Sequence, residues 1–347
     1  MTPQELDERE RRVLEAVIQS YVETAEPAGS RTLTRRFRLG VSPATIRNTM
    51  SDLEAKGYLY HPHTSAGRVP TDLAYRLYVD SLMRPGRVRP REAGRLAEQI
   101  ASGGNAIEAI LRRAAQSLSV VTQELGVALG PSLDGAILDR LELVRLSEER
   151  LLLVLTLSGG AVRTIFVDVA GQIADSALAE VTRVLNERLC GLALHTIRSS
   201  LAVRLRDAGT HPGSHDLLNV FVQEGETLFS MPIAIGDEQV VLGHASTLAE
   251  QPEFASGESM RRLLALTDTR ADLATLLRRR ALTPGISITI GNENADPRLE
   301  DFTVVTAEYR VGALSGVIGV IGPTRMPYEK VVALVRHTSL LVSDILH

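Results

Sequence analysis

The apolar positions near the start of the chain recur at helical spacing and predict a first helix from about Pro3 to Glu23. Its inward face would carry Val13, Leu14, Val17, Ile18 and Tyr21. A Pro-Gly break at residues 26–29 ends this helix. Ser30 is then placed to cap a second, short helix. The pattern therefore predicts two helices separated by a short break.

A third helix is predicted after the tight turn at residues 38–41. Ser42 is a typical N-cap, and Pro43 occupies the first helical position, where its missing N–H costs nothing. Gly57 would end the helix. Its core face would carry Ile46, Met50 and Leu53, and its outer face Thr45, Arg47, Asn48 and Ser51. Such a polar outer face on the second of two closely joined helices is typical of a helix-turn-helix, the alternative being the solvent face of an ordinary three-helix domain.

Residues 58–70 predict a hairpin with a turn-rich tip. Its prolines confine it to an edge. An edge hairpin directly after a recognition helix is typical of a wing, and Arg68 at its tip would reach a phosphate or the minor groove. His61 and His63 lie in the same tip, but two histidines without an adjacent cysteine or carboxylate make a poor metal site, so we expect no metal there.

The rest of the chain alternates between helical and strand patterns. A further helix is expected near residues 73–82, followed by a linker rich in Pro, Gly and Arg at 84–91 and a mostly helical stretch from Glu92 to Leu125 with a break at Gly103–Gly104. Expected strands are Asp139–Leu146, Leu151–Leu157, Val162–Val169, Val240–Leu242, Ile286–Ile290, Phe302–Tyr309 and Gly316–Ile321, and a closing helix runs from Tyr328 to Leu346. Strands on both sides of a largely helical middle indicate one α+β domain interrupted by an insertion.

Composition places the 347-residue chain among ordinary soluble proteins, with 44% hydrophobic and 23% charged residues. It has no apolar run of the ~18 residues that a membrane span needs, and residues 1–12 are too charged for a signal peptide. The single cysteine, Cys190, excludes an internal disulfide and a Cys-rich zinc site, and we interpret it as core. We therefore expect a cytoplasmic protein that does not enter membranes.

The charge is distributed unevenly. Residues 27–70 hold seven basic side chains against Asp52 and Glu54, an excess of five, so the remainder of this chain of net charge −4 carries −9. A basic segment on an acidic chain is typical of polyanion binding, although a solvated helix face would have the same composition. Neither Lys56 nor Lys330 follows a glycine, so there is no phosphate-binding P-loop, and we find no nucleophile motif or cofactor motif. We expect a protein that is not an enzyme and has no cofactor.

Three uncommon strings in this basic segment resemble the HrcA family of heat-inducible repressors: Gly29–Leu33, Ser42–Asn48 and Pro62–Thr71. Tyr75–Asp80 continues the resemblance, and Ile290–Asn294 and Ile318–Met326 are similar to the family's carboxy-terminal signature. The similarity covers nearly the full length and is weakest in the middle. Pro327 departs from it, because the family usually has Asp there, so a partner contact through that carboxylate is in doubt.

The resemblance implies an α+β multidomain fold. It consists of a winged helix-turn-helix at residues 1–83, a linker at 84–91, a GAF-like α+β domain in two parts at 92–175 and 249–347, and an inserted dimerisation domain at 176–248. The DNA-binding residues would be Arg31, Thr32, Ser42, Thr45, Arg47, Asn48, Ser51, His63, Thr64, Ser65 and Arg68. We expect Thr45, Arg47, Asn48 and Ser51 at base edges, and on the DNA backbone or in the minor groove Arg31, Thr32, His63, Ser65 and Arg68.

The function implied is repression of chaperone genes. A homodimer would bind double-stranded DNA at an inverted-repeat operator of the CIRCE type, lose activity on heat stress, and be kept active by the chaperonin. Two alternatives stay open: a regulator that senses a small metabolite in its GAF-like domain, and an enzyme with an appended DNA-binding domain. Gly291 and Gly319–Gly322 are candidates for lining a ligand pocket, but turns around a core strand are the simpler interpretation. Arg278–Arg280, at the end of a predicted helix, is interpreted as structural.

Overall fold

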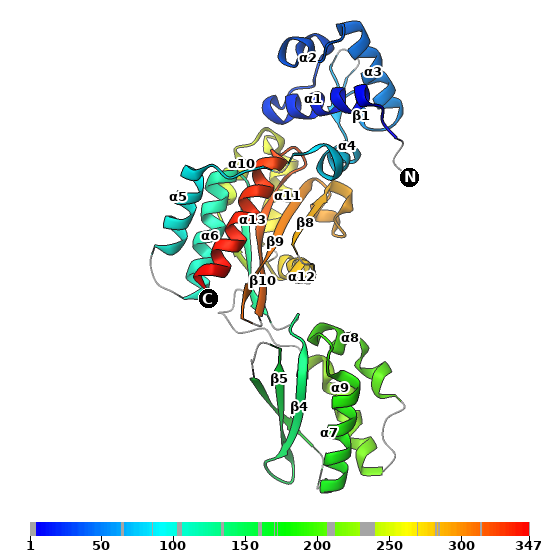
Figure 1. Ribbon diagram of the computed structural model, residues 1–347, viewed down its shortest axis with the longest axis vertical. Coiled ribbons are helices and arrows are strands. Elements are labelled where there is room, and N and C mark those ends of the chain that lie inside the picture. Colours follow the sequence, from blue (N-terminus) through cyan, green and yellow to red (C-terminus); the bar gives the residue numbers. More distant parts are fainter. Residues whose placement is uncertain are drawn as a thin grey trace.

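Three units lie one after another along the long axis of the protein (Figure 1). The computed structural model describes residues 5–63, 66–84, 86–102, 106–132, 135–158, 162–169, 171, 173–206, 212–229, 240–268, 270–281, 283, 285–312 and 314–346. The order of helices and antiparallel sheets confirms the α+β class.

The N-terminal unit contains three helices followed by a short hairpin: α1 (Glu8–Thr24), α2 (Ser30–Arg36), α3 (Pro43–Ala55), β1 (Leu59–Tyr60) and β2 (Val69–Pro70). The first helix begins later than predicted, because Asp7 accepts from the backbone N–H of Glu10 in a capping box. Lys56 joins α3 to α1 through an ion pair with Glu10, 2.7 Å long and mostly buried. Leu14, Leu33 and Ile46 fill the core between the helices.

Two further helical segments follow the hairpin, α4 (Asp72–Leu77) and the π-helical turn η1 (Tyr78–Leu82). Of the predicted linker, Pro85 lies outside the described residues, and the other residues up to Arg89 form neither helix nor strand. Its last two residues, Pro90 and Arg91, already belong to α5 (Pro90–Ala101), which is followed by α6 (Ile107–Thr122). These elements confirm the helix predicted near residues 73–82. The predicted Gly103–Gly104 break lies outside the described residues.

The central unit is built on a five-stranded antiparallel sheet in the order β7-β3-β10-β9-β8. Its strands are β3 (Leu125–Ser132), β7 (Val240–Leu242), β8 (Ile286–Ile290), β9 (Phe302–Val311) and β10 (Leu314–Pro323). One face is covered by α5, α6 and α13 (Tyr328–Ile345), and the other by α10 (Ala245–Ala249), α11 (Gly257–Asp268) and α12 (Arg270–Ala281). Short 3-10 turns, η2 (Pro252–Phe254), η3 (Gly291–Glu293) and η4 (Pro297–Leu299), connect these layers.

Strand β3 was not predicted from the sequence. Both of its faces are buried, with Ala128 in the core under α6 and Val127 in the core under α12, so its residues do not alternate between apolar and polar. Strands β7 to β10 and helix α13 confirm the predicted strands and closing helix near those positions. Pro327 stands just before α13, where its side chain gives no capping hydrogen bond.

The third unit differs in extent from the insertion predicted at 176–248. The strands β4 (Leu138–Arg145), β5 (Arg150–Leu157) and β6 (Val162–Asp168) form their own antiparallel sheet. They share one core with α7 (Asp175–Leu189), α8 (Leu194–Leu205) and α9 (Pro212–Leu228). The inserted unit therefore begins near Ala136, and the three strands assigned to the GAF-like sheet belong to it. Strand β7, placed in the insertion, belongs to the central sheet.

Candidate nucleic-acid interface

The outer face of α3 carries the predicted base-reading side chains. Arg47, Asn48 and Ser51 are exposed, and Thr45 is half-buried. The Ser42 side chain accepts from the backbone N–H of Thr45 at 3.2 Å, which confirms Ser42 as the N-cap. The opposite face buries Ile46, Met50 and Leu53 as predicted. The helix is thereby fixed to the core by one side and presents hydrogen-bonding groups on the other.

The seven basic side chains of residues 27–70 divide into those with an acidic partner and those without one. Arg36 pairs with Glu23, Lys56 with Glu10, and Arg68 with Glu54. The remaining four, Arg31, Arg35, Arg38 and Arg47, are exposed and have no acidic partner in the described part of the chain. Arg31 and its neighbour Thr32 lie in the first turn of α2 and are both exposed. The unpaired cations are those on α2, on the turn after it, and on α3.

Arg68 is not the free cation at the wing tip that the sequence predicted. Its guanidinium donates to Glu54 on α3 at 2.7 Å, its side chain is only 13% exposed, and its Nε is buried without a hydrogen-bond partner in the described part of the chain. Backbone hydrogen bonds between Arg68 and Ala28, at 2.9 Å in both directions, pin it further. A contact of this side chain with DNA would require breaking the pair with Glu54.

The tip of the hairpin is described in part. His63 is exposed, whereas Thr64 and Ser65, two further predicted contacts, lie outside the described residues. His61 has its Nδ1 2.9 Å from a carboxylate oxygen of Glu54. No group of three or more His, Cys, Asp or Glu residues suited to a metal ion occurs among the described residues.

A set of contacts between α4 and the central unit orients the N-terminal unit. Arg76 donates through Nε to Glu293 at 2.7 Å and through Nη2 to the other oxygen of that carboxylate and to the carbonyl of Ile288. Asp72 accepts from the backbone N–H of Asn292 at 3.2 Å. Together these contacts, which we call the clamp, tie α4 to the turn η3. Sequence patterns gave no sign of them, because the partners are more than 200 residues apart.

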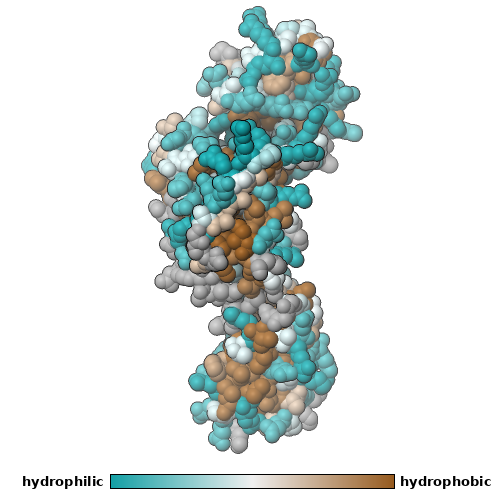
Figure 2. Space-filling model, turned by 60° about the vertical axis from the view of Figure 1, so that its left-hand side comes forward, coloured by the Kyte–Doolittle hydropathy of each residue, from teal (hydrophilic) through white to brown (hydrophobic). Residues whose placement is uncertain are grey.

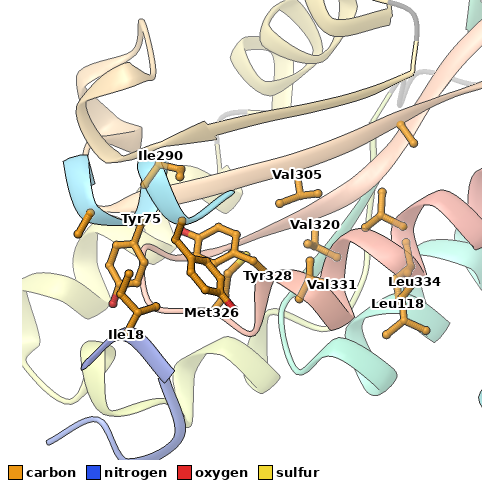
Figure 3. Close-up of a cluster of buried hydrophobic side chains, with 14 of the residues drawn as sticks. Ile18, Tyr75, Leu118, Ile290, Val305, Val320, Met326, Tyr328, Val331 and Leu334 are labelled. Atoms are coloured by element: carbon orange, nitrogen blue, oxygen red, sulfur yellow. The ribbon is translucent and has the colours of Figure 1, made fainter. Parts of the chain in front are cut away.

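The apolar core runs through the same junction. Tyr75 and Tyr328 lie side by side with ring centroids 5.7 Å apart, next to Ile18 and Met326 (Figure 3). Arg325 donates to the carbonyl of Val22 at 2.7 Å at the end of α1. The N-terminal core and the α13 face of the sheet therefore form one continuous cluster of buried side chains.

Among the described residues, no helix covers one face of the three-stranded sheet. Its register places Val144 opposite Leu152 and Leu152 opposite Phe166, which makes an apolar row across all three strands. Val144 is 44% exposed and Phe166 65% exposed. Figure 2 shows a hydrophobic patch over this unit. We call this row the apolar sheet face.

Comparison with known proteins supplies the family. A sequence profile described as the HrcA protein C terminal domain matches residues 108–332. The heat-inducible transcription repressor HrcA of Chlorobium chlorochromatii is 38% identical over 351 residues, which cover 100% of this chain and 99% of that protein. The protein of the same name from Geobacter sulfurreducens is 36% identical over 343 residues, which cover 99% of this chain and 98% of the relative. The chain belongs to the HrcA family.

HrcA-family proteins are transcription repressors, which confirms the resemblance and the expectation of a regulator that is not an enzyme. A solved structure of a hypothetical protein is similar in fold, with a TM-score of 0.57 and 23% identity over 99% of both chains. Within the described ranges of this HrcA-family chain, none of the helices has both the length and the apolar character needed to cross a bilayer.

Proposed function

We propose that this chain represses heat-shock genes by binding operator DNA through a winged helix-turn-helix at its N-terminus. The observation that carries the proposal is the outer face of α3, where Arg47, Asn48 and Ser51 are exposed next to cations without acidic partners in the described segments. A major groove admits one helix, in which Arg pairs with guanine and Asn with adenine. Repressor names on full-length relatives support the same function.

The contacts divide by position. Arg47, Asn48, Ser51 and Thr45 on α3 read base edges, while Arg31 and Thr32 at the start of α2 bind the DNA backbone. Ser42 caps the start of α3, and this exposed residue also contacts a phosphate. His63, Thr64 and Ser65 contact the backbone or the minor groove from the wing. Arg68 acts indirectly, by holding the wing to α3 through Glu54.

Operator binding requires a dimer. One recognition helix covers only a few base pairs, and a two-fold symmetric protein reads an inverted repeat such as the CIRCE element. The apolar sheet face supports a dimer contact in the inserted unit, because a row of Val144, Leu152 and Phe166 in water is unfavourable unless a partner covers it. A second copy of the chain presents the same self-complementary face.

The central unit is GAF-like in our proposal, with its five-stranded antiparallel sheet between two helical layers. Repression falls on heat stress, because a marginally stable protein changes its folded fraction severalfold for one or two kcal/mol. The chaperonin keeps the repressor folded and thereby couples chaperone supply to chaperone gene expression. This regulation rests on the family resemblance.

The experiment is a binding titration at fixed salt that compares an inverted-repeat chaperone operator with a scrambled duplex, with and without chaperonin. We expect a strong preference for the operator that the chaperonin enhances. Arg47→Ala should weaken operator binding by about 1–3 kcal/mol and leave binding to the scrambled duplex nearly unchanged. Arg336→Ala, on the exposed side of α13, removes the same charge away from the interface and serves as the control. Equal, weak binding of the folded protein to both duplexes would refute the proposal.

A further inference from the structure

A pocket lies away from the DNA interface, between α12 and the segment that follows β8. It has a volume of about 550 Å³, within the range of small-molecule sites. Its lining includes Arg279 and Arg280 from α12, Thr289 from the end of β8, and Asn294 and Asp296 from the turn beyond it. The pocket is therefore built on the central sheet and one of its covering helices.

Arg280 is a partly buried cation without a carboxylate partner among the described residues. Its Nη1 donates to the carbonyl of Val304 at 3.2 Å and lies 3.5 Å from Ser287 Oγ, and its Nη2 donates to Thr289 Oγ1. All three acceptors are neutral. Burial lowers the pKa of Arg280 to about 10, and no neighbouring anion offsets that effect. Buried charges are normally paired with an opposite charge. The burial of Arg280 therefore costs free energy that no carboxylate in the described part of the chain offsets.

The acidic side chains that line the pocket pair with cations other than Arg280. Glu293 pairs with Arg76 in the clamp. Asp272 and Asp296 both pair with Arg298, each at 2.6 Å. Arg280 thus lines the pocket with N–H groups that its neutral partners do not use.

The guanidinium of Arg280 is also held rigidly. Thr289, which accepts from it, donates in turn to Asn294 Oδ1 at 2.6 Å. The Asn294 amide donates to the carbonyls of Gly291, Leu299 and Phe302 at 2.8–3.0 Å. A planar guanidinium fixed in this way matches the two oxygens of a carboxylate or phosphate. Because the guanidinium is already fixed, binding such an anion costs little further conformational entropy.

The same segment reaches the DNA-binding unit. Asn294 lines the pocket, and the two residues before it, Asn292 and Glu293, hold Asp72 and Arg76 of α4 in the clamp. An anion that shifts the Thr289–Asn294 link therefore acts on a segment whose other side sets the position of the N-terminal unit. This connection is direct, through neighbouring residues of one turn.

We propose that the pocket at Arg280 is an effector site for a small metabolite bearing a carboxylate or phosphate group, and that its occupancy changes operator affinity through the clamp. The site itself does not depend on the repressor function, whereas its effect on DNA rests on the proposed function. The run Arg278–Arg280, interpreted from the sequence as structural, is thereby divided, with Arg280 assigned to the ligand.

The test measures binding and regulation separately on the full chain. Thermal unfolding is followed against inorganic phosphate and against succinate, with sodium chloride added to keep ionic strength constant. We expect the melting temperature to rise saturably with at least one anion. A rise with phosphate or with succinate shows whether the site takes a phosphate or a carboxylate group. Arg280→Met should abolish the rise, and Arg278→Met, a neighbour outside the pocket lining, should keep it. If Arg280→Met does not fold, Arg280→Lys decides, with an expected loss of about tenfold in affinity because a point charge replaces a bidentate fork.

Operator affinity is then measured with and without the saturating anion. We expect a change of at least fivefold, the lower end of typical couplings, that Arg280→Met or Arg280→Lys removes or reduces. The site is overturned if neither anion raises the melting temperature, or if the Arg280 variants respond like the native chain. Saturable binding with unchanged operator affinity overturns the coupling. A chain that binds the anion but shows no operator preference under any condition overturns the proposed function and leaves the site standing.

Discussion

Arg76 of α4 donates two hydrogen bonds to the carboxylate of Glu293, and this pair ties the N-terminal unit to the turn beyond the edge strand β8. Burial alone would raise the pKa of Glu293, but hydrogen bonds from Arg76 and from the backbone N–H of Ile290 hold that pKa below its ordinary value. The contribution of the pair to stability is therefore present above the ordinary pKa of a glutamate and is lost as the pH falls through the lowered value.

A double-mutant cycle on Arg76→Ala and Glu293→Ala should give a coupling free energy of about 0.5–1 kcal/mol at pH 7, modest because both side chains are partly exposed. Urea unfolding measures it, and repetition in acid should make the coupling vanish. The pair Arg112 and Glu108, exposed on α6, is the matched control and should give less. Zero coupling at pH 7 would mean that the Arg76–Glu293 pair does not contribute to holding the two units together.

Glu124 should make the protein less stable as the pH rises. Glu124 is 2% exposed just before β3, and Gln251 donates to its carboxyl at 3.1 Å. Burial raises the pKa of Glu124 well above its ordinary value. Stability is therefore full below the ordinary pKa of glutamate and falls as the pH rises toward the raised value.

Glu124→Gln removes this ionisation and keeps an oxygen for Gln251. We expect the variant to match the native chain near pH 4 and to need more urea to unfold at pH 7.5. Residue 322 must remain glycine in both chains, because a Cβ at Gly322 would lie 2.1 Å from the Glu124 carboxylate and would disturb the site being compared. An equal pH dependence in both chains would show that Glu124 is ionised in the fold.

The apolar sheet face should control the oligomeric state. Phe166→Glu places a charge where the proposed interface is dry, and the dimer should weaken by about 100-fold or more, as for aromatic anchors at interfaces. Sedimentation velocity over a concentration series measures this. Val203→Glu puts the same charge on an exposed apolar site of α8, on the helical side of the unit, and should leave the dimer intact. A Phe166→Glu dimer as tight as that of the control would place the interface elsewhere.

Arg68 should act by holding the wing. Arg68→Met should cost about 1–3 kcal/mol of stability, because Glu54 loses a charged hydrogen-bond donor. Glu54→Gln separates this role from a DNA contact: it weakens operator binding if Arg68 positions the wing, and strengthens it if the freed guanidinium reaches a phosphate. Titration of the operator with each folded variant distinguishes these two outcomes.

The sequence by itself determined the local elements. Ser42 and Pro43 start α3 because capping and the fixed backbone angle of proline act within a few residues, and the period of Ile46, Met50 and Leu53 shows which face is buried. The strands near residues 138–168 were also predictable, because short apolar runs there are separated by turn residues such as those at 147–149.

Only the tertiary structure decided how these elements combine. The apolar run of β5 predicts a strand, but not that α7, α8 and α9 cover one of its faces, so the inserted unit was bounded wrongly. The continuous apolar run of β3 contains no period that separates strand from helix. The pairing of Arg68 with Glu54 and the isolation of Arg280 arise from side chains that meet in space, where burial strengthens or penalises a charge according to neighbours the local sequence does not specify.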